Sequence, residues 1–175
     1  QEEGRYAVPP NAFLIGIGLV GPTVMIHGTE AQKAAVLPRA LTGEDIWCQL
    51  FSEPAAGSDL AGIRTRARRD GDDWVISGQK VWTSGAHYSS HGILLARTDP
   101  QVPKHKGLTM FLVDMSDPAI ETRPIRQISG GASFNEVFID DLRVPDSARL
   151  GGESEGWKVA LTTLMNERFS ISVGR

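Results

Sequence analysis

Residues 47–61, with the sequence WCQLFSEPAAGSDLA, pass from apolar side chains to a turn rich in small and polar residues. The chain before this stretch is typical of helices and the chain after it of strands, so the stretch marks a change of fold. Its serines and small residues let backbone N–H groups approach a planar or anionic ligand closely. An ordinary turn between a helix and a sheet gives the same pattern, and spacing alone favours that plainer interpretation. No Gly-Lys-Ser/Thr follows, which excludes a P-loop.

The chain downstream of this stretch is rich in predicted strands. Residues 64–69 and 74–76 are joined by the turn Asp-Gly-Asp-Asp, which predicts a β-hairpin. Alternation places Arg64, Arg66 and Arg68 on one strand face, which is typical of a solvated face. Further short apolar runs, bounded by turn residues, lie at residues 93–96, 110–113 and 137–139. Strands at such even spacing predict a small barrel or sandwich.

The chain upstream of the stretch predicts two helices. Asn11 is expected to cap a helix over residues 12–25. Thr29, with Gln32 three residues later, forms a capping-box pattern for a second helix that is expected to stop before Pro38.

A last helix is predicted over residues 155–175. Four apolar side chains are spaced to line one face of it: Leu161, Leu164, Met165 and Phe169. The fold class is therefore α+β, with a central small β-barrel or sandwich flanked by helices at both ends. We expect three regions: helices over 1–47, a β-domain over 48–152, and one further helix over 153–175. Residue 1 is not Met and the chain stops within a helical pattern, so we expect a piece of a longer protein.

Composition narrows the function classes. Of the 175 residues, 41% are hydrophobic and the net charge is −3, which excludes a disordered tail and disfavours nucleic acid or an anionic membrane as partner. The single Cys48 excludes a disulfide framework and a cysteine-rich zinc site, and predicts a buried thiol. His87 and His91 are four residues apart, but their context is not helical, so we expect no metal. No apolar run is long enough to span a membrane, and we expect a soluble, cytoplasmic protein.

A second candidate site follows the predicted strand at residues 78–81. There Trp82 stands beside two hydroxyls, Thr83 and Ser84. Such a group can form one wall of an aromatic cofactor site and hydrogen-bond the polar edge of the cofactor. A core tryptophan at a strand end is the alternative interpretation.

Taken together, the motifs resemble the acyl-CoA dehydrogenase family. Residues 47–61 resemble its first signature, and residues 78–84, GQKVWTS, are similar to its second conserved strand. Residues 138–145, FIDDLRVP, resemble the strand before its C-terminal domain, and residues 28–33 with 37–38 match the helix pair before the first signature. The order and spacing agree over residues 11–174. Each motif is weak alone, and their order makes the signal strong.

The resemblance implies a specific activity. Family members bind FAD between the β-domain and the C-terminal helices and oxidise an acyl-CoA thioester to the trans-2-enoyl-CoA. A carboxylate removes the α-proton, and a hydride leaves the β-carbon for the flavin. Electrons then pass to an electron-transfer flavoprotein, and the subunits form homo- or hetero-oligomers. In a eukaryote, the expected location would be the mitochondrial matrix.

The resemblance also assigns roles to single residues. It implies FAD contacts for eight residues: Gln49, Phe51, Ser52, Gly57, Ser58, Trp82, Thr83 and Ser84. Ser58 would also meet the substrate. Ala55 replaces the glycine that is usual after Glu-Pro, so the loop should differ from the family's if that position needs a positive φ.

Glu167 and Arg168 are the most consequential pair. In some branches of the family the catalytic glutamate occupies the position of Glu167, and in most others it lies far downstream, beyond Arg175. Arg168 matches a position used near the CoA moiety. A surface glutamate paired with a nearby arginine is the alternative for Glu167.

Three functions stay open from the sequence. The first is an acyl-CoA dehydrogenase, an oxidoreductase that uses FAD. The second is a catalytically incomplete β-domain, either a fragment or a subunit, that does not hold FAD alone. The third is an acyl-CoA oxidase, in which O₂ is the acceptor.

Overall fold

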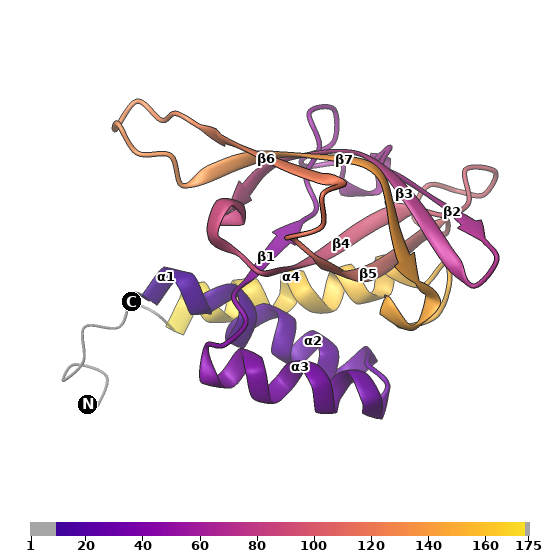
Figure 1. Ribbon diagram of the computed structural model, residues 1–175, viewed down its shortest axis with the longest axis horizontal. Helices are drawn as coiled ribbons and strands as arrows, with labels where there is room; N and C mark the ends of the chain where they lie inside the picture. The colour runs from indigo at the N-terminus through magenta and orange to yellow at the C-terminus, as the bar shows by residue number, and fades with distance from the viewer. Residues whose placement is uncertain (1–9, 174–175) are drawn as a thin grey trace.

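The computed structural model describes residues 10–173, with side-chain surroundings for residues 12–168. Helices lie below a curved sheet (Figure 1). The helical segments are α1 (Pro10–Phe13), the π-helical η2 (Leu14–Val20), α2 (Gly21–His27), α3 (Glu30–Thr42) and α4 (Gly156–Val173), with short 3₁₀ turns η3 (Leu60–Gly62), η4 (Ala86–Tyr88) and η5 (Asp146–Ala148). No helix in the described part of the chain is long and apolar enough to cross a membrane.

Eight strands form one sheet. They are β1 (Trp47–Leu50), β2 (Arg66–Asp70), β3 (Asp73–Ser84), β4 (His91–Arg97), β5 (Leu108–Asp114), β6 (Ile120–Ile125), β7 (Phe134–Pro145) and β8 (Arg149–Leu150). Their order is β6-β7-β3-β2-β4-β5-β8, and β1 pairs in parallel with β4. The predicted hairpin is confirmed as β2 and β3.

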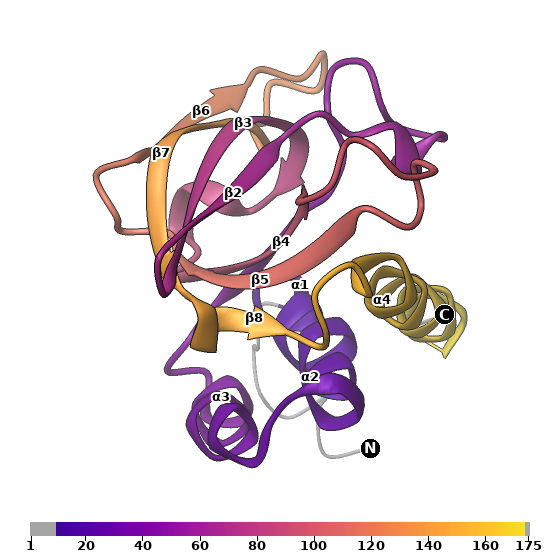
Figure 2. The ribbon, with the colours of Figure 1, turned by 90° about the vertical axis from the view of Figure 1, so that its right-hand side faces the viewer.

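The sheet curls strongly but does not close into a barrel (Figure 2). The two ends of the strand path, β6 and β8, do not pair with each other. The α+β class is therefore confirmed, and a closed barrel is wrong. Closure requires two edge strands to meet, whereas here β8 is a two-residue strand that leads directly toward α4.

The curled sheet separates two hydrophobic cores. One core lies inside the curl and includes the edge-on pair of Trp74 and Phe111, whose ring centroids are 5.5 Å apart. The other lies between the sheet and the helices. Strand β4 supplies Leu94 to the first core and Ile93 to the second. Because β4 is covered on both faces, its sequence is a continuous apolar run.

The N-terminal helices differ in detail from the prediction. The expected helix over 12–25 begins at Pro10 and passes through the π-helical η2, and Asn11 lies inside α1 rather than at its cap. The capping box of Thr29 and Gln32 is confirmed. The expected stop before Pro38 is wrong, because α3 continues to Thr42 and ends at Gly43, which adopts the left-handed conformation.

Helix α4 packs against the sheet and α2. The Oγ1 atoms of Thr23 and Thr163 lie 3.1 Å apart, and His27 Nε2 lies 2.8 Å from Thr162 Oγ1. The predicted apolar face is wrong for Leu161 and Met165, which are exposed, whereas Val159, Ala160 and Thr163 are buried. Leu164 packs on the core as expected, and the side chain of Phe169 lies outside the described residues.

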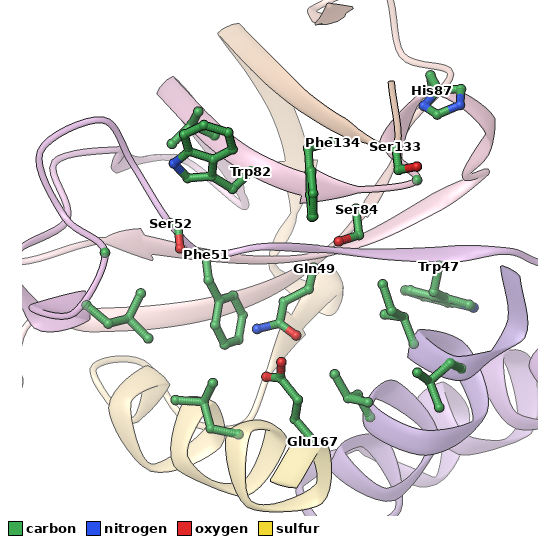
Figure 3. Close-up of a pocket in the computed structure, with 18 of the residues that line it drawn as sticks. Trp47, Gln49, Phe51, Ser52, Trp82, Ser84, His87, Ser133, Phe134 and Glu167 are labelled. Carbon is green, nitrogen blue, oxygen red and sulfur yellow. The ribbon is translucent and has the colours of Figure 1, made fainter. Parts of the chain in front are cut away.

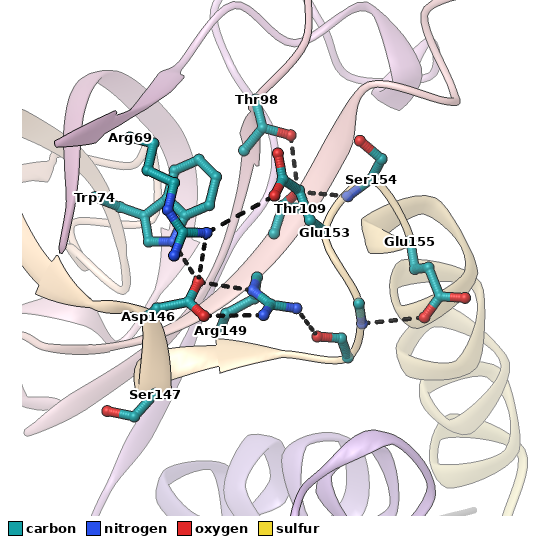
Figure 4. A network of polar contacts seen from close by, with 12 residues as sticks. Arg69, Trp74, Thr98, Thr109, Asp146, Ser147, Arg149, Glu153, Ser154 and Glu155 are labelled. Carbon is teal, nitrogen blue, oxygen red and sulfur yellow. Dashed lines mark hydrogen bonds and ion pairs between the residues drawn. The ribbon is translucent and has the colours of Figure 1, made fainter. Parts of the chain in front are cut away.

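An ion network fixes the connection from β7 to α4 (Figure 4). The carboxylate of Asp146 accepts hydrogen bonds from Arg149 Nε at 2.9 Å and from Trp74 Nε1 at 2.8 Å. Arg69 Nη1 lies 3.5 Å from the same carboxylate. The hydrogen bonds from Arg149 and Trp74 hold the pKa of Asp146 well below its usual range.

Replacing Asp146 by asparagine is expected to reduce the loss of folding stability that occurs when the pH is lowered from 6 to 3. A carboxyl whose pKa is lowered on folding stabilises the fold above its ordinary pKa of about 4, and this contribution is lost as the pH falls further. The free energy of unfolding, measured with urea at pH 6 and pH 3, should therefore change less with pH in Asp146→Asn than in the wild type. Asp72→Asn, an exposed carboxylate in the β2–β3 turn, is the control. Equal pH dependence in the wild type and Asp146→Asn would contradict the prediction.

Candidate active site

A pocket of about 990 Å³ opens between the sheet and the helices (Figure 3). Its upper wall comes from β1, the C-terminal end of β3 and the start of β7, and its floor comes from η2 and α4. Seven of the eight predicted FAD contacts line it: Gln49, Phe51, Ser52, Gly57, Ser58, Trp82 and Ser84. Glu167 also lines it, whereas Thr83 and Arg168 do not.

Strand alternation directs the side chains of β1 into the pocket. Cys48 and Leu50 face the core inside the curl, and Gln49 and Phe51 face the helices. The predicted buried thiol is confirmed, because Cys48 is fully buried. Burial raises the pKa of this thiol to about 12, which disfavours the reactive thiolate.

The loop after β1 is held by a small turn. Glu53 and Ala56 exchange two backbone hydrogen bonds of 3.0 Å, which leaves Gly57 and Ser58 exposed at the pocket rim. Ala55 does not adopt a positive φ, so the position tolerates a side chain and the departure from the family's glycine causes no strain.

A β-bulge near the end of β3 presents Trp82 to the pocket. The register between β3 and β7 shifts between Lys80 and Thr83, and Trp82 has a φ of 60°. A bulky residue with positive φ is uncommon and marks a functional or strained site. Trp82 is 60% exposed and meets the ring of Phe134 edge-on, with the centroids 6.3 Å apart. An exposed tryptophan at a strained position is poorly explained by core packing.

Strand alternation places Thr83 and Ser84 on opposite faces of β3. Ser84 faces the pocket, and Thr83 is buried on the other side of the strand. The Thr83 hydroxyl has no partner among the described residues. The geometry therefore does not bring Thr83 to the predicted cofactor wall.

Glu167 enters the pocket from the opposite side. It extends from α4 toward Gln49 on β1 and Phe51 directly after β1 (Figure 3). Arg168, one residue on, is exposed and outside the pocket lining. The pocket thus places one carboxylate opposite a wall that carries aromatic rings, an amide and hydroxyl groups.

Several pocket residues were not singled out from the sequence for this role. Phe134 is the first residue of β7, Ser133 directly precedes it, and His87 comes from η4. The Nδ1 atom of His87 lies 3.1 Å from Asn135 Oδ1, and His91 instead stacks on Trp47 with the centroids 5.0 Å apart. The described residues contain no group of three or more His, Cys, Asp or Glu side chains placed to hold a metal.

The pocket suits a flat aromatic ligand with polar edges. Apolar walls from Phe51, Leu60 and Trp157 accompany a few polar side chains, which is the usual composition of cofactor sites. The Trp82 ring is 60% exposed and packs edge-on against Phe134, so much of it is free to contact a ligand. These features fit an isoalloxazine ring.

Comparison with known proteins identifies related chains. A family model described as "Acyl-CoA dehydrogenase, middle domain" matches residues 48–142. Acyl-CoA dehydrogenase FadE34 of Mycobacterium tuberculosis is 54% identical over 153 residues, which are 87% of this chain and 22% of that protein. Acyl-CoA dehydrogenase IpdE1 of the same organism is 45% identical over 175 residues, which are 100% of this chain and 46% of that protein.

Solved structures agree with these matches. The Tcur3481-Tcur3483 steroid ACAD has a TM-score of 0.86 at 39% identity, over 90% of this chain and 41% of that chain. A glutaryl-CoA dehydrogenase from Mycobacterium smegmatis in complex with FADH2 has a TM-score of 0.78 at 34% identity, over 89% of this chain and 39% of that chain. The chain spans less than half the length of each of these relatives.

Proposed function

Because this chain belongs to the acyl-CoA dehydrogenase family, we propose that the protein that carries it dehydrogenates an acyl-CoA thioester to the trans-2-enoyl-CoA with bound FAD. The observation that carries this proposal is the placement of Glu167 across the pocket from the wall of Gln49, Trp82 and Ser84. A carboxylate facing a ring-binding wall provides one group on each side of a substrate chain.

The residues of the upper wall would hold the flavin. Trp82 and Phe51 offer aromatic surface, and Ser84, Ser52 and Gln49 offer hydrogen bonds to its polar edges. When bound, FAD supplies a hydride acceptor for the β-carbon of the substrate. Fixed donors on this wall favour that transfer, because the ring gains negative charge when it is reduced.

Glu167 would act as the base. Its carboxylate would take the α-proton of the thioester, and the surrounding apolar side chains of Leu164 and Trp157 would limit the access of water. Ser58 at the rim and Arg168 on the outer face of α4 would contact the CoA moiety. Ser58 lines the pocket, and Arg168 is an exposed cation one residue from the proposed base.

The electron acceptor would be an electron-transfer flavoprotein, and the active form would be an oligomer. Both proposals follow from membership of the family. Trp82 lies both at the proposed cofactor wall and at the protein surface, where a docked partner could approach it.

Visible spectroscopy of the full-length protein tests the function. Protein incubated with FAD and then passed through gel filtration should keep the flavin bands, and an acyl-CoA should bleach them without oxygen. Straight-chain and steroid-derived thioesters should be compared, because one of the related structures is a steroid ACAD. Retained flavin that no thioester bleaches would contradict the proposed activity. A colourless protein would favour the catalytically incomplete alternative.

Packing of Trp82 on the flavin predicts fluorescence quenching. In the full-length protein, adding FAD should quench tryptophan emission more in the wild type than in Trp82→Phe, because an indole stacked near a flavin loses its emission. Emission should be corrected for absorption by free FAD, and Trp74→Phe, at a buried tryptophan inside the curl, is the matched control. Equal quenching in the wild type and Trp82→Phe would remove this role from Trp82.

A further inference from the structure

Lys80 lies in the protein interior, directly behind the pocket wall. Its side chain is fully buried on β3. The ammonium donates three hydrogen bonds: to the Phe51 carbonyl at 3.1 Å, to Glu53 Oε1 at 2.9 Å and to the Leu95 carbonyl at 2.8 Å. All three of its protons are therefore used, which is the condition for keeping a buried charge.

Glu53 completes the arrangement. Its carboxylate also accepts the backbone N–H groups of Arg64, at 2.6 Å, and Thr65, at 2.9 Å. Burial alone would raise the pKa of Glu53, but the Lys80 charge and these donors hold it below its usual value. Burial lowers the pKa of Lys80 to about 8, although the negative charge of Glu53 acts to raise it. The ion pair ties the end of β1 to β3, β4 and the segment before β2.

The contact with Phe51 has a consequence for the pocket. The described chain contains no cis peptide bond, so the Phe51–Ser52 peptide is trans, and its C=O and N–H point in opposite directions. The C=O points inward to Lys80. The N–H of Ser52 therefore points away from Lys80, and no described residue accepts it. Ser52 lines the pocket, and its carbonyl is already fixed by the Val81 N–H at 2.9 Å.

We propose that Lys80 is a positioning residue, which orients and polarises the Phe51–Ser52 peptide so that the Ser52 N–H donates a hydrogen bond to the flavin ring. This inference rests on the proposed function. A cation bound to one end of an amide strengthens the donor at the other end, because hydrogen bonds in a chain polarise one another. A fixed, strengthened donor stabilises the negative charge that the ring gains on reduction more than it stabilises the oxidised ring.

The test is the reduction potential of FAD in the full-length holoenzyme. In Lys80→Met, whose unbranched side chain is one atom shorter and carries no charge, FAD should bind about tenfold more weakly. The affinity for reduced FAD should fall about tenfold further than the affinity for oxidised FAD. For a two-electron couple, this difference makes the reduction potential about 30 mV more negative than in the wild type. The dissociation constant comes from flavin fluorescence, and the potential from equilibration with a reference dye.

Two further variants separate positioning from general destabilisation. Ile76→Ala truncates a fully buried side chain on the same strand, in the core inside the curl, so it should lower the melting temperature without moving the potential. The double variant Lys80→Met with Glu53→Gln removes both charges together, which avoids leaving one buried charge unpaired and so favours folding. It should reproduce the shift in potential.

Different results would overturn the inference about Lys80 and the proposed function. An unchanged potential in the folded Lys80→Met or double variant would overturn the inference, as would an equal shift in Ile76→Ala. A wild-type protein that binds no FAD would instead contradict the proposed function. The two failures are therefore distinguished before any variant is compared.

Discussion

In the full-length protein, Glu167→Gln is expected to slow bleaching of the flavin by an acyl-CoA about a thousandfold, while FAD stays bound. Glutamine keeps the shape of the side chain that extends from α4 into the pocket, but its amide cannot take up the α-proton. The rate is measured as the loss of flavin absorbance after rapid mixing without oxygen. Binding of the substrate should persist, because the proposed contacts of the CoA moiety are Ser58 and Arg168, which this substitution leaves in place.

The control is Glu153→Gln, an exposed carboxylate just before α4 whose partner is Arg69, 3.9 Å away. It should bleach at the wild-type rate, because it lies outside the pocket lining. Bleaching at the wild-type rate in Glu167→Gln would show that the base lies elsewhere, beyond Arg175. That outcome would leave the family membership and the FAD wall in place.

Local patterns in the sequence predicted local structure well. The capping box at Thr29 involves residues three positions apart, and the β2–β3 hairpin depends on one turn, so both follow from neighbouring residues. The face alternation of Arg66 and Ala67, exposed and buried, is likewise a property of one strand. The expected stop before Pro38 was wrong because α3 is also held from beyond that proline. The N–H groups of Glu44 and Asp45, which follow the helix, both donate to the Arg39 carbonyl and cap its C-terminal end.

Structural features that depend on residues far apart in the chain could not be predicted from local sequence patterns. The sheet stays open because of how β6 and β8 end, which no single strand determines. The exposure of Leu161 and Met165 on α4 reflects which face of that helix meets α2 and β5. That contact joins residues far apart in the chain, such as Thr23 and Thr163. The resemblance predicted roles for Gln49, Trp82 and Glu167, and all three line one pocket. The bulge next to Trp82 depends on the pairing of β3 with β7, so a local pattern could not predict it.

Gly156 is expected to control where α4, and therefore Glu167, sits against the sheet. A Cβ atom at this position would lie 2.6 Å from Thr109 Cα and 2.7 Å from the carbonyl carbon of Leu108. Both atoms belong to the backbone of β5, which is held in place by its pairing with β4 and β8. Adding a side chain must therefore push the start of α4 outward.

Gly156→Val should accordingly lower the free energy of unfolding by about 3 kcal/mol, the upper part of the range for overpacked sites. It should also slow bleaching by an acyl-CoA, because a shift of about 1 Å in a catalytic group costs about a hundredfold in rate. Gly131→Ala is the matched control, since its Cβ would meet only side-chain atoms at 3.5 Å or beyond and its φ is not positive. Wild-type stability in Gly156→Val would show that α4 can slide on β5. Glu167 would then be positioned by the rest of the pocket, and the close approach at Gly156 would carry no catalytic consequence.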